Sequence, residues 1–300
     1  SFPQLTVVML TGLASLLATG SISIFQFAQN LYFVPVGIFG VSYSVALFPR
    51  LNAAYLARDG SRFFHEFFGG IRAILFWTIP SAVLFLVLRV EIVRVVLGGR
   101  AFSWENVQLT AACLGLLTIA IIAASLMPHL VKSFYALENT RAPLRTDMGG
   151  SVVSVVLAFA FTRLISYSAS FTAMLTTFLG VPNTPHPEVL GIALGFSLGL
   201  AANVLLLYSV LMPFAGRVFG KGQSFPILPI LKIITASLGA GIAAYGVHVH
   251  FFETIARGSA LLIFAHGLLA GAVGLLVYSG LLLLFKSEDI EALSRSLRKG

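Results

Sequence analysis

Residues 1–49 contain no Asp, Glu, Lys or Arg. A transmembrane helix needs about 20 consecutive, mainly apolar residues, so this stretch can hold two spans joined by a tight turn at residues 18–21. Inside a bilayer the backbone must satisfy its own hydrogen bonds, and a helix does so within one segment. The uncharged stretch therefore predicts an all-α membrane protein.

The rest of the chain has the same character. It is 58% hydrophobic and 10% charged, with a mean hydropathy of +0.95, whereas about a quarter of the residues of a soluble domain are charged. Apolar windows separated by charges, Gly and Pro predict a polytopic transmembrane helix bundle of about eight spans. The predicted spans are 4–19, 22–48, 68–88, 107–134, 148–167, 189–213, 227–249 and 258–285.

Two connecting segments are long enough to interpret. Residues 88–102, LRVEIVRVVLGGRAF, mix charges with Val and Ile at helical spacing and predict a short helix at the membrane surface, and Ser103 is placed to cap the next span. Residues 168–188 are rich in Ser and Thr and end in VPNTPHPE, which predicts a loop outside the membrane.

The positive charges predict the orientation in the membrane. If the first span runs outward from the cytoplasm, fourteen of the nineteen Lys and Arg residues lie on the cytoplasmic side, as the positive-inside rule requires. The tail 286–300 is then cytoplasmic. This topology, together with anionic lipid headgroups, accounts for the net charge of +8 without nucleic acid as a partner.

The second predicted span carries a stripe of small and polar residues. On a helix that turns about 100° per residue, the members of the stripe are Ser23, Gln26, Asn30, Gly37 and Ser44, with Gln29 at its edge. Pro35 removes a backbone donor and predicts a kink or a loosened turn. Residue types alone favour hydrogen bonding and close packing against a neighbouring helix. The alternative is a hydrated cavity, with Pro35 and Gly37 as a hinge.

The remaining polar residues predict structural roles. Gly191, Gly195 and Gly199 recur every four residues and lead to Asn203, which predicts close packing against another helix. His129 and His266 are interpreted as hydrogen-bonded core histidines. His248 and His250 point away from each other on a helix, so no metal site is expected. No phosphate loop, nucleophile elbow or zinc-protease motif occurs, which predicts neither a catalytic site nor a cofactor.

Three blocks carry a family resemblance. Residues 132–145, KSFYALENTRAPLR, resemble the Arg/Lys-x-Phe-Tyr-Ala-Leu-x-Asp/Asn-Thr-Arg-x-Pro signature of the MurJ (MviN) family of lipid II flippases. Residues 35–51, PVGIFGVSYSVALFPRL, and residues 92–102, IVRVVLGGRAF, resemble two further family blocks in the same order. The family belongs to the multidrug/oligosaccharidyl-lipid/polysaccharide exporter superfamily.

The resemblance implies a flippase in the bacterial cytoplasmic (inner) membrane. Its substrate is an undecaprenyl-linked peptidoglycan precursor, lipid II, moved from the inner to the outer leaflet by alternating access. The eight spans resemble spans seven to fourteen of the family. Residues 1–216 then form the second six-helix lobe, 217–285 two added helices with a groove for the lipid tail, and 286–300 the tail, while the N-terminal lobe is a missing partner.

The resemblance also implies site residues. Those expected in the substrate cavity are Ser23, Gln26, Gln29, Asn30 and Arg141, with Pro35 and Gly37 permitting a bend. Arg141 and Arg145 also fit simple positive-inside anchoring, which is favoured for Arg145 and left open for Arg141.

The chain departs from the family at one position pair. Family members usually carry an Asp-Arg pair where this chain has Gln29-Asn30, and a neutral amide cannot supply the charge of arginine to a diphosphate. Alternatives therefore stay open: a non-transporting membrane scaffold or regulator of cell-wall assembly, or a sister exporter of another prenyl-linked glycan.

Overall fold

The chain folds into a bundle of long helices. The computed structural model describes residues 2–97, 103–182, 184–220, 225–250 and 260–286, and all regular structure in them is helical. The elements are α1 (Phe2–Ser15), α2 (Ser21–Pro35), the π-helical segment η1 (Val36–Val41), α3 (Ser42–Leu56), α4 (Gly60–Val87), α5 (Arg89–Leu97), α6 (Trp104–Ala136), α7 (Arg141–Tyr167), α8 (Ala169–Phe178), α9 (Val189–Phe219), α10 (Ile227–His250) and α12 (Ala260–Leu284).

Seven of the described helical segments are long and apolar enough to cross a membrane. One of them is the continuous run of α2, η1 and α3 from Ser21 to Leu56. The first predicted span, 4–19, corresponds to α1, which has 14 residues and ends at Ser15. The helix stops there because residues 16–20 form a turn, in which Gly20 takes the left-handed φ of 96°. The predicted polytopic all-α bundle is confirmed.

The predicted loop 168–188 is partly wrong, because it contains the helix α8. The Ser168 hydroxyl accepts a hydrogen bond from the Phe171 amide at 3.4 Å and caps this helix. Thr172 donates to the carbonyl of Ile165 in α7 at 2.7 Å, and Leu175 and Thr176 are buried. Hydroxyl residues that indicated a loop here instead cap a helix and anchor it to its neighbour.

The predicted short helix and the span that follows it are confirmed as helices where they are described, while the position of the short helix at the membrane surface stays a prediction. Residues 89–97 form α5, while 98–102 lie outside the described residues. Ser103 Oγ accepts a hydrogen bond from the Asn106 amide at 3.3 Å and caps α6. The start of the last predicted span, 258–259, and nearly all of the tail 286–300 also lie outside the described residues.

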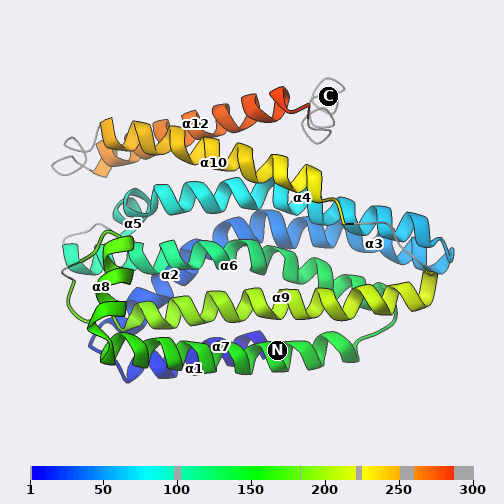
Figure 1. Ribbon diagram of the computed structural model, residues 1–300, viewed down its shortest axis with the longest axis horizontal. Helices are drawn as coiled ribbons and strands as arrows, with labels where there is room; N and C mark the ends of the chain where they lie inside the picture. Colours follow the sequence, from blue (N-terminus) through cyan, green and yellow to red (C-terminus); the bar gives the residue numbers. More distant parts are fainter. Residues whose placement is uncertain (1, 98–102, 183, 221–224, 251–259, 287–300) are drawn as a thin grey trace.

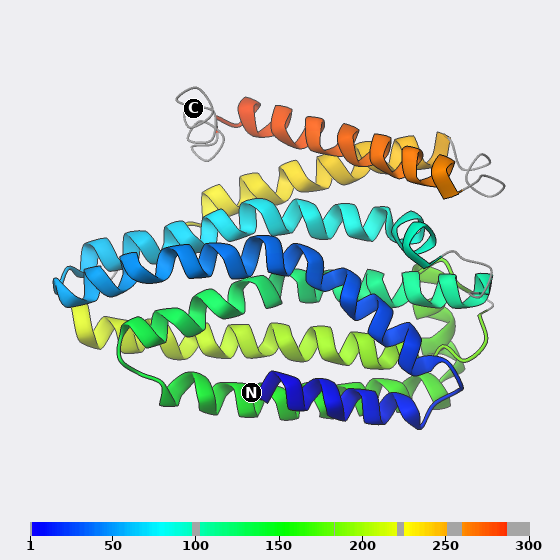
Figure 2. The same ribbon diagram turned by 180° about the vertical axis from the view of Figure 1, so that it is seen from behind.

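The long helices lie side by side, and each one packs against the next (Figures 1 and 2). From one edge to the other the order is α12, α10, α4, α6, α9, α7 and α1, with α2 and α3 packed on α6 and α4. The connections after α3 and α6 share one end of the bundle, hereafter the loop end. The helices α5 and α8 share the opposite end, hereafter the α5–α8 end.

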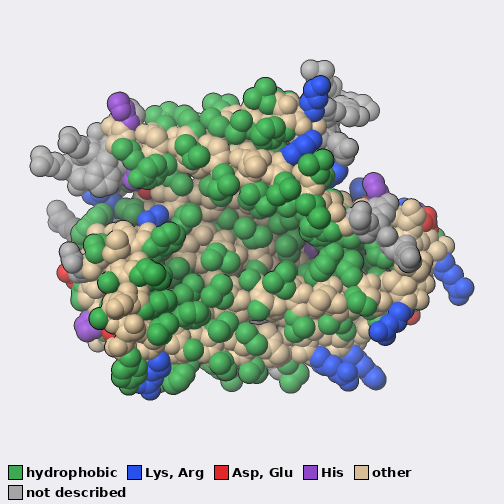
Figure 3. Space-filling view, viewed as in Figure 1, with side chains coloured by type: hydrophobic (Ala, Val, Ile, Leu, Met, Phe, Trp, Pro, Cys, Tyr) green, Lys and Arg blue, Asp and Glu red, His purple; other side chains and the backbone are tan. Residues whose placement is uncertain are grey.

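The outer surface matches a membrane setting. Green hydrophobic side chains cover much of the long face in Figure 3, and Lys and Arg gather toward the ends of the helices. Exposed apolar residues occur on many of the long helices, among them Val152 on α7 and Leu276 on α12. A soluble protein rarely exposes so wide an apolar surface, so a multi-pass membrane location follows.

The closest helix contact joins α7 and α9. A Cβ atom on Gly195 would lie 2.2 Å from the backbone nitrogen of Ala158, and one on Gly191 would lie 2.4 Å from that of Thr162. Gly199 meets Ser154 in the same way. The predicted role of this glycine ridge in close packing is confirmed, since two backbones approach where no side chain separates them.

Candidate functional site

A cavity of about 850 Å³ opens between α1, α2, α6, α7 and α9. Much of its wall is apolar, including Phe33, Met127, Phe196 and Leu200. Its polar and charged lining residues are Gln4, Thr6, Gln29, Asn30, Lys132, Asp147, Ser151, Ser154 and Asn203. A mainly apolar hollow with a few convergent polar groups is the usual form of a binding site.

The helix α2 contributes Gln29 and Asn30 to the cavity wall. The Asn30 side chain is exposed and the Gln29 side chain is half-buried, so neither amide is sealed in a helix contact. Ser23 and Gln26 are also exposed, but they lie in the first two turns of α2 and outside the cavity lining. Two of the four residues of α2 that were expected in the cavity are therefore on its wall, and the substrate roles of all four stay predictions.

The helix loosens directly after Pro35, as the sequence predicted. Pro35 is buried and is followed by the π-helical segment η1, and such segments are often found at functional sites. A Cβ atom on Gly37 would have no heavy atom within 4 Å, whereas one on Gly40 would lie 2.5 Å from Ser125 Cα. The close contact in this segment is thus made at Gly40, and a hinge role for Pro35 and Gly37 stays a prediction.

The far end of the predicted stripe is not on the exposed face. Ser44 is fully buried, and its hydroxyl donates to the Gly40 carbonyl at 2.5 Å. A π-helical turn holds more residues than an α-helical turn, so η1 changes the register of everything that follows it. The 100° periodicity that groups Ser44 with Asn30 does not hold across this segment.

The positive charge on the cavity wall comes from Lys132 of α6. Arg141, the predicted cavity cation, begins α7 at the loop end, where its side chain is exposed and outside the lining. The Asn139 carboxamide accepts a hydrogen bond from the Ala142 amide at 3.1 Å and fixes this first turn. Lys132 lies in the family block 132–145, but the sequence alone does not distinguish it from the lysines and arginines that anchor helix ends at the membrane surface.

The negative charge on the wall comes from Asp147 of α7, which sequence reasoning missed. Asn203 of α9 donates through Nδ2 to Asp147 Oδ1 at 3.1 Å. Asn203 is 6% exposed, and its own Oδ1 has no hydrogen-bond partner among the described residues. The sequence does contain a pattern that could have indicated Asp147. It lies three, four and seven residues before Gly150, Ser151 and Ser154, so it shares a helix face with these cavity residues.

The described residues contain no group of three or more His, Cys, Asp or Glu side chains placed to hold a metal ion. The cavity brings together one charge of each sign, several neutral polar groups and a broad apolar wall. Such a lining suits a molecule that has both polar and apolar parts.

Comparison with known proteins places these features in one family. The model of a family described as "Lipid II flippase MurJ" matches residues 1–266. A probable lipid II flippase MurJ of Thermotoga maritima is 30% identical over 180 residues, which cover 56% of this chain and 37% of the relative. A counterpart from Buchnera aphidicola subsp. Schizaphis graminum is 27% identical over 261 residues, covering 83% of this chain and 50% of the relative.

A solved structure shares the fold. The structure titled "Lipid II flippase MurJ, inward closed conformation" superposes with a TM-score of 0.71 at 23% identity. The match covers 95% of this chain and 51% of that chain. The chain therefore spans 37% and 50% of the length of these two relatives and 51% of the length of this structure.

Proposed function

Because the chain belongs to the MurJ family of lipid II flippases, we propose that it is the part of a transporter that moves lipid II from the inner to the outer leaflet. The match to the family over residues 1–266 carries this proposal. In this role the chain works with an N-terminal lobe, which accounts for its coverage of 51% of the matching structure. It is a transporter and not an enzyme.

The cavity has the chemistry that the headgroup of such a substrate needs. Lys132 supplies a cation for the diphosphate, and Gln29 and Asn30 supply neutral donors and acceptors for the sugars and the peptide. The hydrogen bond from Asn203 to Asp147 fixes the opposite wall. Because Asn30 lacks the charge of the family's arginine, Lys132 is the cation that this cavity wall offers to the diphosphate.

The two added helices have the chemistry that a prenyl tail needs. We propose the division 1–216 for the second six-helix lobe, 217–285 for the tail-binding helices and 286–300 for a cytoplasmic tail. The helices α10 and α12 pack on each other and on α4 and α5, at the edge of the bundle away from α1. Their exposed surface is apolar, with Leu238, Ile242 and Leu276 among the most exposed residues. A long hydrocarbon is stable against such a face.

The charges orient the protein in the bacterial inner membrane. The loop end, where Arg58, Arg141 and Arg145 lie, faces the cytoplasm, and the α5–α8 end faces outward. The C-terminus is then cytoplasmic. Alternating access of the two lobes bends the second helix at Pro35 and η1, where the backbone hydrogen bonds are already rearranged.

Complementation tests the proposed function directly. Cells depleted of their own lipid II flippase are supplied with the full-length parent protein, and lipid II reaching the outer leaflet is measured. We expect translocation and growth to be restored. Absence of lipid II translocation, when the protein is present in the membrane at normal amounts, contradicts the proposal. Native mass spectrometry of the bound lipid then distinguishes a sister exporter of another prenyl-linked glycan.

Asn30 favours a second candidate, a non-transporting scaffold in cell-wall assembly, because its amide lacks the charge of the family's arginine. We expect Asn30→Arg to raise lipid II transport of the parent protein several-fold if the chain is a flippase, since a second cation joins Lys132 on the wall. The same flux assay measures this effect, with Gln26→Arg, outside the cavity, as the matched control. Zero flux in both variants, together with stable capture of a cell-wall enzyme, favours the scaffold.

A further inference from the structure

A buried carboxylate lies where α5, α10 and α12 meet. Glu91 of α5 is 2% exposed. His248 of α10 contacts Glu91 Oε1 through its Nδ1 atom, and Nδ1 of His266, from α12, lies 3.9 Å from the same oxygen. The two imidazole rings have their centroids 6.2 Å apart. One carboxylate therefore receives a histidine from each of the two added helices.

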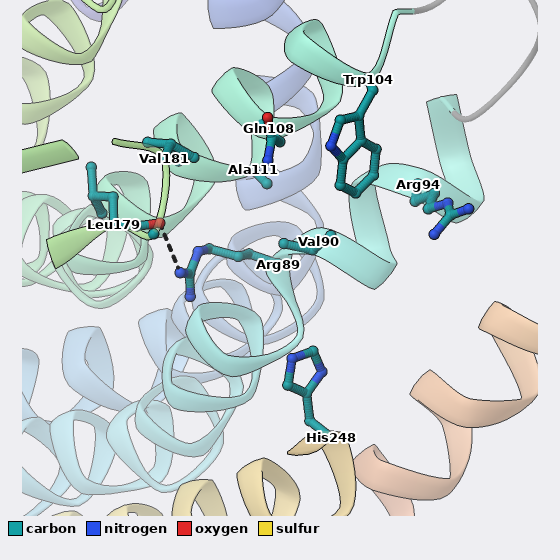
Figure 4. A pocket seen from close by; sticks show the side chains of 11 residues that line it. Arg89, Val90, Arg94, Trp104, Gln108, Ala111, Leu179, Val181 and His248 are labelled. Carbon is teal, nitrogen blue, oxygen red and sulfur yellow. Dashed lines mark hydrogen bonds between the residues drawn. The ribbon is translucent and has the colours of Figure 1, made fainter. Parts of the chain in front are cut away.

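A second cavity, of about 580 Å³, reaches this cluster at the α5–α8 end. Figure 4 shows Arg89, Trp104 and Gln108 around it, with His248 on the side of α10. The exposed fraction of the side chains falls from 15% for His248 to 8% for His266 and 2% for Glu91. Of the three groups, His248 lines the cavity, while His266 and Glu91 are more deeply buried.

The other polar groups around the carboxylate leave it incompletely compensated. Arg89, on the same helix, donates to the carbonyls of Leu86 at 2.6 Å and Leu179 at 3.1 Å, the second shown dashed in Figure 4. Burial lowers the pKa of Arg89, while the charge of Glu91 and of Tyr245 on α10 opposes this shift. Glu91 Oε2 is buried without a hydrogen-bond partner among the described residues.

The backbone of α12 comes close to the same carboxylate side chain. A Cβ atom on Gly267 would lie 3.5 Å from Glu91 Cβ. Tyr245 of α10 stacks on His248 with ring centroids 6.1 Å apart. A buried charge is stable only when it is paired and hydrogen-bonded, and His248 and His266 are placed to pair with this carboxylate.

We propose that Glu91, His248 and His266 form a proton-binding site that holds α10 and α12 against α5, so that the seating of this helix pair depends on pH. An imidazolium binds a carboxylate more strongly than a neutral imidazole does. Histidine ordinarily exchanges its proton between about pH 5 and 8. Proton binding favours the seated state, so the stabilisation is present at the acidic side of this range and is lost as the pH rises through it.

The proposal concerns the packing of this chain and does not rest on lipid transport. It is tested with the full chain in lipid nanodiscs, carrying nitroxide labels at Leu276→Cys on α12 and Val152→Cys on α7, both exposed positions. Double electron–electron resonance then gives the distance distribution from pH 5.5 to 8.5. We expect the displaced population of α12 to rise several-fold over this range, because loss of the imidazolium charge weakens the contacts with Glu91.

Variants assign the pH response to the cluster. His248→Gln combined with His266→Gln, and Glu91→Gln alone, are expected to give distance distributions that do not change with pH. His250→Gln, an exposed histidine on the same helix, is the matched control and is expected to keep the response of the parent chain. A parent chain whose distances are the same at pH 5.5 and 8.5 overturns the proposal. So does a pH response that survives in the double variant.

Discussion

Gly195→Ala is expected to separate α7 from α9 and to lower the free energy of unfolding by about 1–3 kcal/mol, the usual cost of overpacking a well-packed contact. The new methyl group would lie 2.2 Å from the Ala158 nitrogen and 2.3 Å from its Cα atom. These are backbone atoms, so no side-chain rotation can relieve the overlap. Unfolding in mixed detergent micelles, followed by circular dichroism, measures the change.

Gly216→Ala is the matched control, because Gly216 lies on the same helix and a Cβ atom there would meet nothing within 4 Å. Alanine is the better helix former by about 0.8–1 kcal/mol, so this variant is expected to be as stable as the parent or more stable. Gly191→Ala should behave like Gly195→Ala, since its Cβ would lie 2.4 Å from the Thr162 nitrogen. Equal stability of Gly195→Ala and Gly216→Ala contradicts the role of the ridge.

The existence of the helices could be predicted because the bilayer leaves few alternatives. A window such as 107–134 must hydrogen-bond within itself, and it became the centre of α6. The ends were harder to predict, since α6 runs from Trp104 to Ala136 and helices continue past the apolar core into the interface. The glycine ridge was also predictable, because small residues at a spacing of four leave only the backbone at a helix surface.

Features that depend on a break in periodicity were not predictable from a helical wheel. Asn30 and Ser44 share a face on an ideal helix, yet Asn30 is exposed and Ser44 is fully buried. The π-helical segment Val36–Val41 lies between them, and Pro35 indicated a loosening without giving its form. Local residue types also mislead at α8. The Ser and Thr residues of this segment predict a loop, but Ser168 caps a helix.

Features that depend on long-range contacts were missed for a different reason. His248 and His266 are separated by eighteen positions and Glu91 is far from both in sequence, yet all three meet at one point. Asp147 and Asn203 meet across α7 and α9 in the same way. Sequence periodicity shows which residues share a face of one helix, but it does not show which faces meet.

Lys132→Met is expected to lower lipid II translocation by the full-length parent protein by about 10- to 100-fold. A hydrogen bond to a charged group contributes about 1.5–3 kcal/mol, and Lys132 is the basic residue among those that line the cavity. The methionine side chain keeps the apolar stem and removes only the charge, so the amount of folded protein should not change. The assay is lipid II flux to the outer leaflet, normalised to protein in the membrane.

Two further variants separate a local effect from a general loss of positive charge. Lys132→Arg retains a cation and is expected to keep most of the flux. Lys232→Met removes a lysine from α10, outside the cavity, and is expected to transport like the parent. If Lys132→Met and Lys232→Met transport equally well, the cavity does not bind the diphosphate through Lys132. In that case, the cation that binds the diphosphate lies elsewhere in the full-length protein.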